Sequence, residues 1–247
     1  MLHAQTDPSI ITRSTMYGAG FANVYDNYLS PQEYRGVEFR LLRESERAAK
    51  RSPEKWQLQT LFQGFVDYTH NRADNNHTLA AMVNWNYGWL YKFYQSGQWQ
   101  VQAGGMADIN GGFIYNMRNG NNPANARLYT NADATARVFW NTHIKRTPIL
   151  LRYQLSVPLV GVMFSPHYGQ SYYEIFSLND NKGVVKTTTP FSQPSAKSIL
   201  SADIEVFKTT LRLAYVCEIQ QAKLNGIKSH LYSNAFMIGV VKHLKKL

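Results

Sequence analysis

The sequence predicts an all-β protein, a transmembrane antiparallel up-and-down β-barrel of about ten strands with short periplasmic turns and long outer loops. Three observations lead to this prediction. Runs in which apolar and polar residues alternate recur along the whole chain. Turn-forming residues separate these runs at intervals that are alternately short and long. No apolar run approaches the roughly 20 residues that a membrane-spanning helix needs.

The composition fits one folded domain. The chain has 247 residues and a net charge of +10, with 17% charged and 13% aromatic residues. So few charges and so many aromatic residues exclude a disordered chain. The one cysteine, Cys217, excludes an intramolecular disulfide framework and a CxxC motif.

The first residues resemble the end of a secretory signal peptide, with Leu2 and Ala4 in the pattern that precedes a cleavage site. We therefore expect residues 1–4 to be a signal-peptide remnant and residues 5–13 to form an N-terminal periplasmic segment. Residues 14–247 are expected to form a single barrel domain.

Each expected strand is a run with a period of two, which indicates β-structure rather than helix. The clearest run has Val83, Trp85 and Tyr87 on one face and Asn84 and Asn86 on the other. The expected strands are Met16–Tyr25, Val37–Arg47, Trp56–Tyr68, Leu79–Tyr94, Trp99–Asn116, Leu128–Trp140, Ile149–Leu155, Leu200–Val206, Leu211–Ile219 and Leu231–Leu244. No helix is expected between them.

The links between the runs favour a membrane barrel. Short links are expected near 52–55, 96–98, 145–148 and 208–209, and long links near 26–36, 70–78, 117–126, 158–197 and 221–229. A soluble β-barrel or sandwich also alternates, but its polar face would be dense in charge, unlike the faces found here. Because lipid offers no hydrogen-bond partners, the sheet must close, and Phe236–Val241 is expected to pair with Tyr17–Phe21.

Charged residues of both signs fall on the polar faces of the runs. A barrel of this size has little interior space, so they are expected to form a network that plugs the lumen. A catalytic or transport network is the alternative. The expected interior charge network comprises Glu38, Arg40, Asp67, Asp108, Asp133, Arg137, Arg152, Asp203, Glu205, Arg212 and Glu218.

The excess positive charge gathers at the expected periplasmic end, where it would face lipid phosphates or water. These residues are Arg47, Lys50, Arg51, Lys55, Lys145, Arg146, Lys208, Lys242, Lys245 and Lys246. No basic stripe interleaves with stacking aromatic residues, so nucleic acid is not an expected partner.

The longest outer loop, residues 158–197, is aromatic rather than disordered in composition. It would either close the barrel mouth as a lid or plug, or present aromatic anchors to another protein. The expected binding residues are Phe164, Tyr168, Tyr172, Tyr173 and Phe176.

Catalytic signals are weak. His230 and Ser233 are spaced i, i+3, which places them on opposite faces of a strand. The rim offers His70, Asp74 and His77, residue types common in solvated loops, and weak catalytic candidates are His167, Glu174 and Arg152. No metal-ligand motif is present, and no metal or cofactor is expected.

Four segments carry a family resemblance: GGFIYNMRNGNNPANA at 111–126, FSPHYGQSYYEIF at 164–176, Leu151–Gln154 and the run Val157–Val162. Over nearly its whole length, the chain resembles a family of Bacteroidetes outer-membrane barrel proteins catalogued as a domain of unknown function. The resemblance implies a fold and a location, and it brings no catalytic residue.

Together these observations favour an outer-membrane barrel of a Gram-negative bacterium with a plugged lumen. We expect a non-enzymatic component of an envelope assembly that binds a partner protein or lipid. Expected partners are outer-membrane lipid, lipopolysaccharide and other outer-membrane proteins. The alternatives are a surface-facing hydrolase acting on lipid A, phospholipid or peptide, and a narrow channel.

Overall fold

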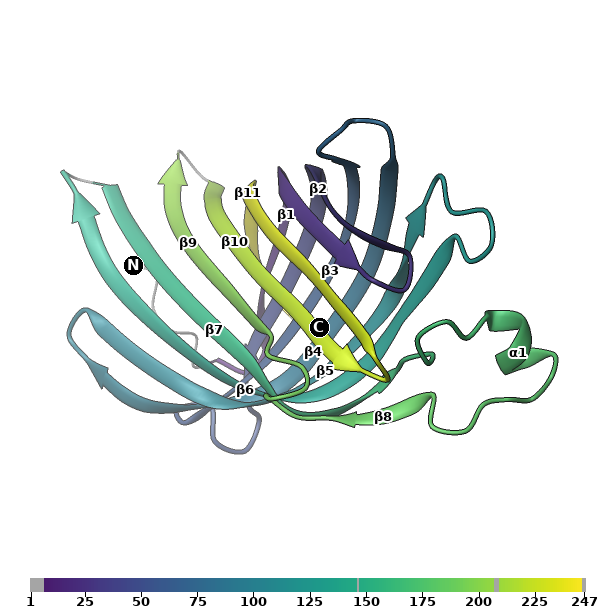
Figure 1. The fold of residues 1–247 in the computed structure, drawn as a ribbon. Coiled ribbons are helices and arrows are strands. Elements are labelled where there is room, and N and C mark those ends of the chain that lie inside the picture. The colour runs from purple at the N-terminus through teal and green to yellow at the C-terminus, as the bar shows by residue number, and fades with distance from the viewer. Residues whose placement is uncertain (1–6, 146, 207–208, 246–247) are drawn as a thin grey trace.

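The computed structural model describes residues 7–145, 147–206 and 209–245, and in this part of the chain an antiparallel sheet closes into a barrel (Figure 1). The strands are β1 (Ile10–Asp26), β2 (Ser30–Ala48), β3 (Trp56–Asn71), β4 (His77–Ser96), β5 (Trp99–Asn116), β6 (Ala124–Ile144), β7 (Thr147–Phe164), β8 (Val185–Thr188), β9 (Ala196–Val206), β10 (Thr209–Leu224) and β11 (Ile227–Lys245). One helix, α1 (Tyr172–Phe176), lies between β7 and β8.

Ten strand positions close the barrel, as the sequence predicted, because β8 and β9 share one position. Both pair with β7, β9 along Ile149–Ser156 and β8 along Gly161–Phe164. The first and last strands also pair, with Tyr17 opposite Ile238 and Phe21 opposite Asn234. The predicted pairing of these two segments is therefore confirmed, and it closes the sheet into a cylinder.

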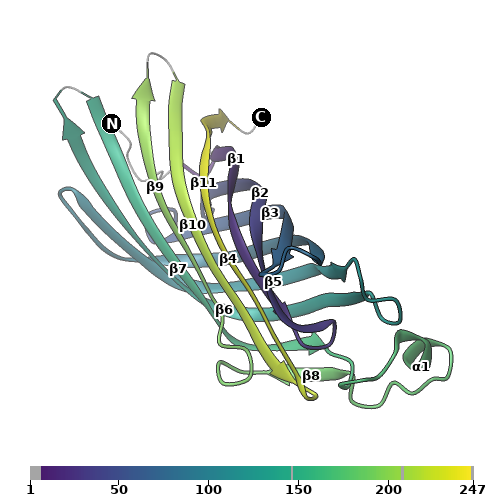
Figure 2. The same cartoon turned by 45° about the horizontal axis from the view of Figure 1, so that its top comes forward.

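The two ends of the barrel differ. Ile10 pairs with Lys245 at one end, which we call the terminus end. The segment with α1 extends from the opposite end, which we call the loop end (Figure 2). β1 begins at Ile10, so residues 10–13 of the expected N-terminal segment 5–13 belong to the barrel. The expected signal-peptide remnant, residues 1–4, lies outside the described residues.

Two of the predicted long links are wrong. The link after β1 is residues 27–29, and the link between β10 and β11 is only Asn225 and Gly226. Both of these residues have positive φ, 51° and 78°, which suits a two-residue hairpin turn. An Asn-Gly pair between alternating runs is a strong hairpin signal, and it was present in the sequence.

The expected loop 158–197 is shorter and more ordered than predicted. β7 continues to Phe164, and residues 165–195 contain α1 and β8. The expectation of no helix was therefore wrong, because Ser171 and Glu174 form a capping box that starts α1. None of the helical segments in the described residues is long and apolar enough to cross a membrane.

The outer wall is apolar and the interior is polar or closely packed. Val83, Trp85 and Trp89 are exposed, whereas Asn84 and Asn86 are buried in the lumen. This arrangement is the reverse of a soluble barrel, and it confirms the predicted phase of the strands.

Buried side chains line the lumen in four layers, which follow one another along β2 from the loop end. The outer apolar layer contains Tyr34, and the outer polar layer contains Glu38 and Arg40. The inner apolar layer contains Leu42, and the inner polar layer contains Glu44 and Glu46. Further members of the outer apolar layer are Val24, Phe65, Met82, Ile114, Tyr129, Met163 and Leu231, and of the inner apolar layer Met16, Leu61, Val216 and Met237.

Close strand approach at Gly20 gives a first testable prediction. A Cβ at this position would overlap the backbone oxygen of Asn234 and lie 2.6 Å from the Cα of Ala235. We expect Gly20→Ala to lower the free energy of unfolding by about 1–3 kcal/mol, because the strand backbones must move apart. The midpoint of guanidinium unfolding in detergent micelles measures this change.

Gly64→Ala is the matched control, because a Cβ there would meet only the backbone oxygen of Met82, at 3.8 Å. We expect this variant to be as stable as the native protein or slightly more stable, since alanine reduces the freedom of the unfolded chain. Equal destabilisation of both variants would contradict the role assigned to Gly20.

Candidate functional site

Arg40 organises the outer polar layer. Its Nε donates to Glu38 Oε1 at 2.6 Å, and its Nη1 donates to Glu218 Oε2 at 2.6 Å. The remaining donors reach Gln63 Oε1 at 3.0 Å and Ser233 Oγ at 2.9 Å. The guanidinium therefore ties β2 to strands on both sides of the lumen, and its fork geometry makes these strong, directional bonds.

A second part of the outer polar layer surrounds Asp108. Its carboxylate accepts hydrogen bonds from Asn84, Asn86, Asn110 and Asn131. The Lys197 ammonium donates to Asn86 at 3.1 Å and lies 3.8 Å from Glu218. These contacts link the Asp108 cluster to the Arg40 cluster.

The inner polar layer is balanced in charge. Glu44 accepts from Arg152, from Arg212 and, at 2.6 Å, from Gln59. Glu46 accepts from Arg137 and, at 2.9 Å, from Arg152. Arg212 also donates to Asp203, with an Nη2–Oδ2 distance of 2.6 Å. Buried charges are tolerated here because each lies against at least one partner of opposite sign.

The structure buries all the residues of the predicted network except Glu205. Glu205 lies on the inward phase of β9 but next to its end, where the side chain is exposed to solvent. Sequence reasoning missed Glu44, Glu46 and Lys197. The first two follow Glu38 and Arg40 at even positions of β2, so strict alternation would have found them.

The loop at 165–195 is held against the barrel rim by tyrosine hydroxyls. Tyr172 accepts from the Ala126 amide at 2.6 Å and donates to Asn125 Oδ1 at 3.0 Å. Tyr28 donates to the carbonyl oxygen of Gln170 at 2.7 Å. Desolvation, together with the nearby Tyr172 and Asp26, raises the pKa of Tyr28 to about 12, so this hydroxyl remains a donor across the physiological range.

The capping box also fixes the start of α1. Glu174 accepts from the Ser171 amide at 2.7 Å and from the Ser171 hydroxyl at 2.8 Å. These hydrogen bonds hold the pKa of Glu174 below its usual range. Glu174 therefore caps the first turn of the helix.

The five expected binding residues divide into two groups. Tyr172 and Phe164 are partly buried and stack with Phe176, at ring-centroid distances of 6.1 Å and 6.4 Å from it. Tyr168, Tyr173 and Phe176 are exposed, and Leu178 adds a further exposed apolar side chain. The first group anchors the loop and the second forms a surface at the loop end.

The three weak catalytic candidates do not come together. His167 lies in the loop, with its Nε2 3.2 Å from the carbonyl oxygen of Lys182, and Glu174 lies in α1. Arg152 lies in the inner polar layer, bound to Glu44 and Glu46. The structure therefore places Arg152 in the lumen and the other two candidates in the loop, and it does not bring all three together.

Other polar candidates also give no reactive arrangement. Ser233 is buried and accepts from Arg40, while His230 lies on the opposite face beside Asn23, at 2.9 Å, as the spacing predicted. At the rim, His70 Nδ1 lies 3.3 Å from Asp74 Oδ1, and the rings of His70 and His77 are 6.4 Å apart. Within the described ranges, no group of three or more His, Cys, Asp or Glu residues could hold a metal ion.

The anchoring role of Tyr172 gives a second prediction. We expect Tyr172→Phe to increase the rate of proteolysis within 165–195 roughly fivefold, because the lost hydroxyl bonds cost about 1 kcal/mol of local stability. Limited proteolysis of the folded protein measures this rate. Tyr173→Phe is the control, since that side chain is exposed, and equal rates for both variants would contradict the anchoring role.

Comparison with solved structures supports the fold. The outer membrane protease OmpT from Escherichia coli superposes with a TM-score of 0.51 at 6% identity, covering 96% of this chain and 97% of that one. The transport unit of the autotransporter AIDA-I from Escherichia coli gives a TM-score of 0.48 at 10% identity, with coverages of 98% and 91%. Ail, the attachment invasion locus protein of Yersinia pestis, gives 0.31 at 8% identity, with coverages of 94% and 98%.

At such low identity the first of these comparisons shows a shared barrel fold, which is the fold of outer-membrane proteins. A search of proteins with curated functions found no match. A family model described as a protein of unknown function, DUF3316, matches residues 2–247. The chain therefore belongs to the DUF3316 family of proteins of unknown function.

Proposed function

We propose that this protein is an integral outer-membrane barrel of a Gram-negative bacterium that presents a non-enzymatic binding surface for a partner protein outside the cell. The apolar outer wall and the closed sheet support the membrane placement. The longest strands, β4 and β6, have 20 and 21 residues, whereas about 9–11 residues cross a bilayer. The barrel can therefore rise above the membrane and carry its loop end toward partners.

The filled lumen supports an anchor rather than a channel. Two polar layers and two apolar layers follow one another between the barrel ends, and the large side chains of Arg40, Arg137 and Tyr34 are almost fully buried. A conducting pore would need a continuous aqueous path, which such packing does not provide. We infer that the buried charges fix the strands rather than guide a solute.

One observation carries the proposed binding role: the loop is rigidly anchored but leaves its own apolar side chains in water. Tyr173 is 65% exposed and Leu178 is 60% exposed, although Tyr172 and Tyr28 fix the backbone around them. Exposed aromatic residues on a preorganised surface are typical of protein-binding hot spots. The loop contributes little to the stability of the barrel through these side chains, so we assign them to partner binding.

Crosslinking in intact cells tests this proposal. A photoreactive amino acid at Tyr173 is expected to capture one defined outer-membrane or extracellular protein. Binding of that purified partner should become roughly thirtyfold weaker in Tyr173→Ser with Leu178→Ser, the loss typical of a hot spot. The control is Phe191→Ser, since Phe191 is 95% exposed in the same loop but lies beyond β8.

Two results would overturn the proposal. One is capture of lipopolysaccharide alone, which would make the loop a lipid-binding element. The other is equal partner affinity in the double variant and the Phe191→Ser control. The hydrolase alternative gains no support from the site, because His167 and Glu174 lie apart from Arg152.

A further inference from the structure

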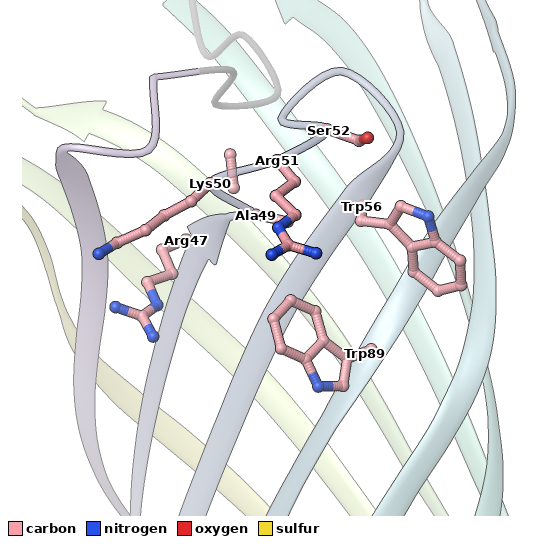
Figure 3. Close-up of a pocket in the computed structure, with 8 residues that line it drawn as sticks. Arg47, Ala49, Lys50, Arg51, Ser52, Trp56 and Trp89 are labelled. Atoms are coloured by element: carbon pink, nitrogen blue, oxygen red, sulfur yellow. The ribbon is translucent and has the colours of Figure 1, made fainter.

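A basic groove with two tryptophans lies on the outer wall at the terminus end. Its volume is about 640 Å³, and it is lined by the end of β2, the turn that follows it, and residues of β3 and β4. The lining residues are Arg47, Ala48, Ala49, Lys50, Arg51, Ser52, Trp56 and Trp89. Figure 3 shows Arg51 pointing toward Trp89, with Arg47 on one side and Trp56 on the other. The groove is separate from the loop surface, since the two lie at opposite ends of the barrel.

Among the described residues, the bases of the groove form no direct ion pair. Within the described part of the chain, none of Arg47, Lys50 and Arg51 has a carboxylate within 4.0 Å. The nearest acids along β2, Glu44 and Glu46, point into the lumen and are occupied by other arginines. Three unpaired cations beside one hollow favour an anion, and arginine forks match the oxygens of a phosphate.

The rest of the groove is apolar and continues onto the outer wall. Leu58 is only 5% exposed, although it lies on the outward phase of β3. It pairs with Arg47 on one side and with Trp89 on the other, so these longer side chains flank it. Further toward the loop end the wall exposes Phe62, Trp85 and Tyr87. A ligand seated here would place its anionic part among the bases and its apolar part along these residues.

The position of the groove on the barrel wall indicates which class of ligand it binds. On β2 the outward residues Val37 and Phe39 are apolar and exposed, and the bases Arg43 and Arg47 follow toward the terminus end. Such a change from apolar residues to bases and tryptophans marks the boundary between hydrocarbon and headgroups. We propose that the groove binds the phosphate of a glycerophospholipid in the leaflet nearest the termini, with its acyl chains along β3 and β4.

This inference rests on the membrane placement proposed above, and it adds a defined lipid site to it. Native mass spectrometry of detergent-solubilised protein titrated with dioleoyl phosphatidylglycerol tests it. We expect one phosphatidylglycerol molecule to bind more tightly than any further molecules. The double variant Arg47→Gln with Arg51→Gln is expected to weaken this first binding event roughly ten- to thirtyfold.

The matched control removes the same charge elsewhere at the same end. Lys242→Gln with Lys245→Gln changes two exposed bases of β11 that do not line the groove, so it should leave the affinity within about twofold. Equal weakening in both double variants would indicate a general charge effect and would overturn the site. No weakening in the arginine variant would overturn it as well.

Two further probes separate the possible sources of the signal. Inorganic phosphate that competes at the affinity of the lipid would identify a simple anion site and contradict the lipid assignment. Dioleoylglycerol that binds as tightly as the phospholipid would show that the bases take no part. Flotation of the protein with phosphatidylglycerol vesicles tests the membrane placement independently: failure to float refutes both proposals, whereas flotation without selective binding refutes only the lipid site.

Discussion

Arg40→Met is expected to be among the most destabilising single changes in the barrel, lowering the free energy of unfolding by about 3–5 kcal/mol. The substitution keeps most of the side-chain length but removes the cation between Glu38 and Glu218, both nearly fully buried. It also removes the guanidinium that lies 4.3 Å from the centre of the Phe65 ring. The cost arises mainly because Glu38 loses its salt-bridge partner and Glu218 keeps only the Lys197 ammonium, 3.8 Å away.

Guanidinium unfolding in micelles measures the effect, and the temperature at which the band shifts on an SDS gel gives a second measure. The control is Arg35→Met on the same strand, since Arg35 pairs with Glu33 at 3.4 Å and both side chains are at least half exposed. We expect a change below about 1 kcal/mol for this surface pair. Adding Glu218→Gln to Arg40→Met should restore part of the stability, and no recovery would contradict the assigned ion pair.

Glu44→Gln is expected to have an effect of similar size, about 3–5 kcal/mol, in the inner polar layer. Its carboxylate accepts from both Arg152 and Arg212, and Arg137 lies 3.9 Å away. The amide keeps the shape but leaves one buried positive charge in excess. The fraction of protein that remains folded across a urea titration measures the loss.

Glu205→Gln is the control for this change, because Glu205 is an exposed carboxylate near the end of β9. We expect it to shift stability by less than about 0.5 kcal/mol. Adding Arg152→Gln to Glu44→Gln should recover stability, since it removes the excess charge. If the two single glutamate variants were equally stable, the inner polar layer would not hold the strands as described.

The two double-variant tests also separate stability from function. Neither layer touches the exposed loop surface or the basic groove, so rescued proteins should bind partner protein and phospholipid as the native protein does. Loss of binding in a fully rescued variant would indicate that the lumen communicates with these surfaces.

The alternation along each run, together with the turn-forming links between the runs, predicted the barrel and its closure. Trp85 and Asn84 fall on opposite faces because successive side chains of a strand alternate, and this rule depends only on local backbone geometry. The same rule predicted the inward direction of Arg40 and Arg137 and the separation of His230 from Ser233. The Asn225-Gly226 turn was readable too, since positive φ is a local preference of these residues.

Only the tertiary structure decided which charges meet. Arg40 and Glu218 are 178 positions apart, and Arg212 and Glu44 are 168 apart, so their pairing follows from closure and strand tilt rather than from spacing. Glu205 shares the inward phase but lies beside a strand end, where its side chain is exposed. The sequence thus determined a closed sheet with an apolar outer wall, because period and turns are local. The layers, the anchored loop and the basic groove depend on three-dimensional closure, because their parts come from strands that meet only in the barrel.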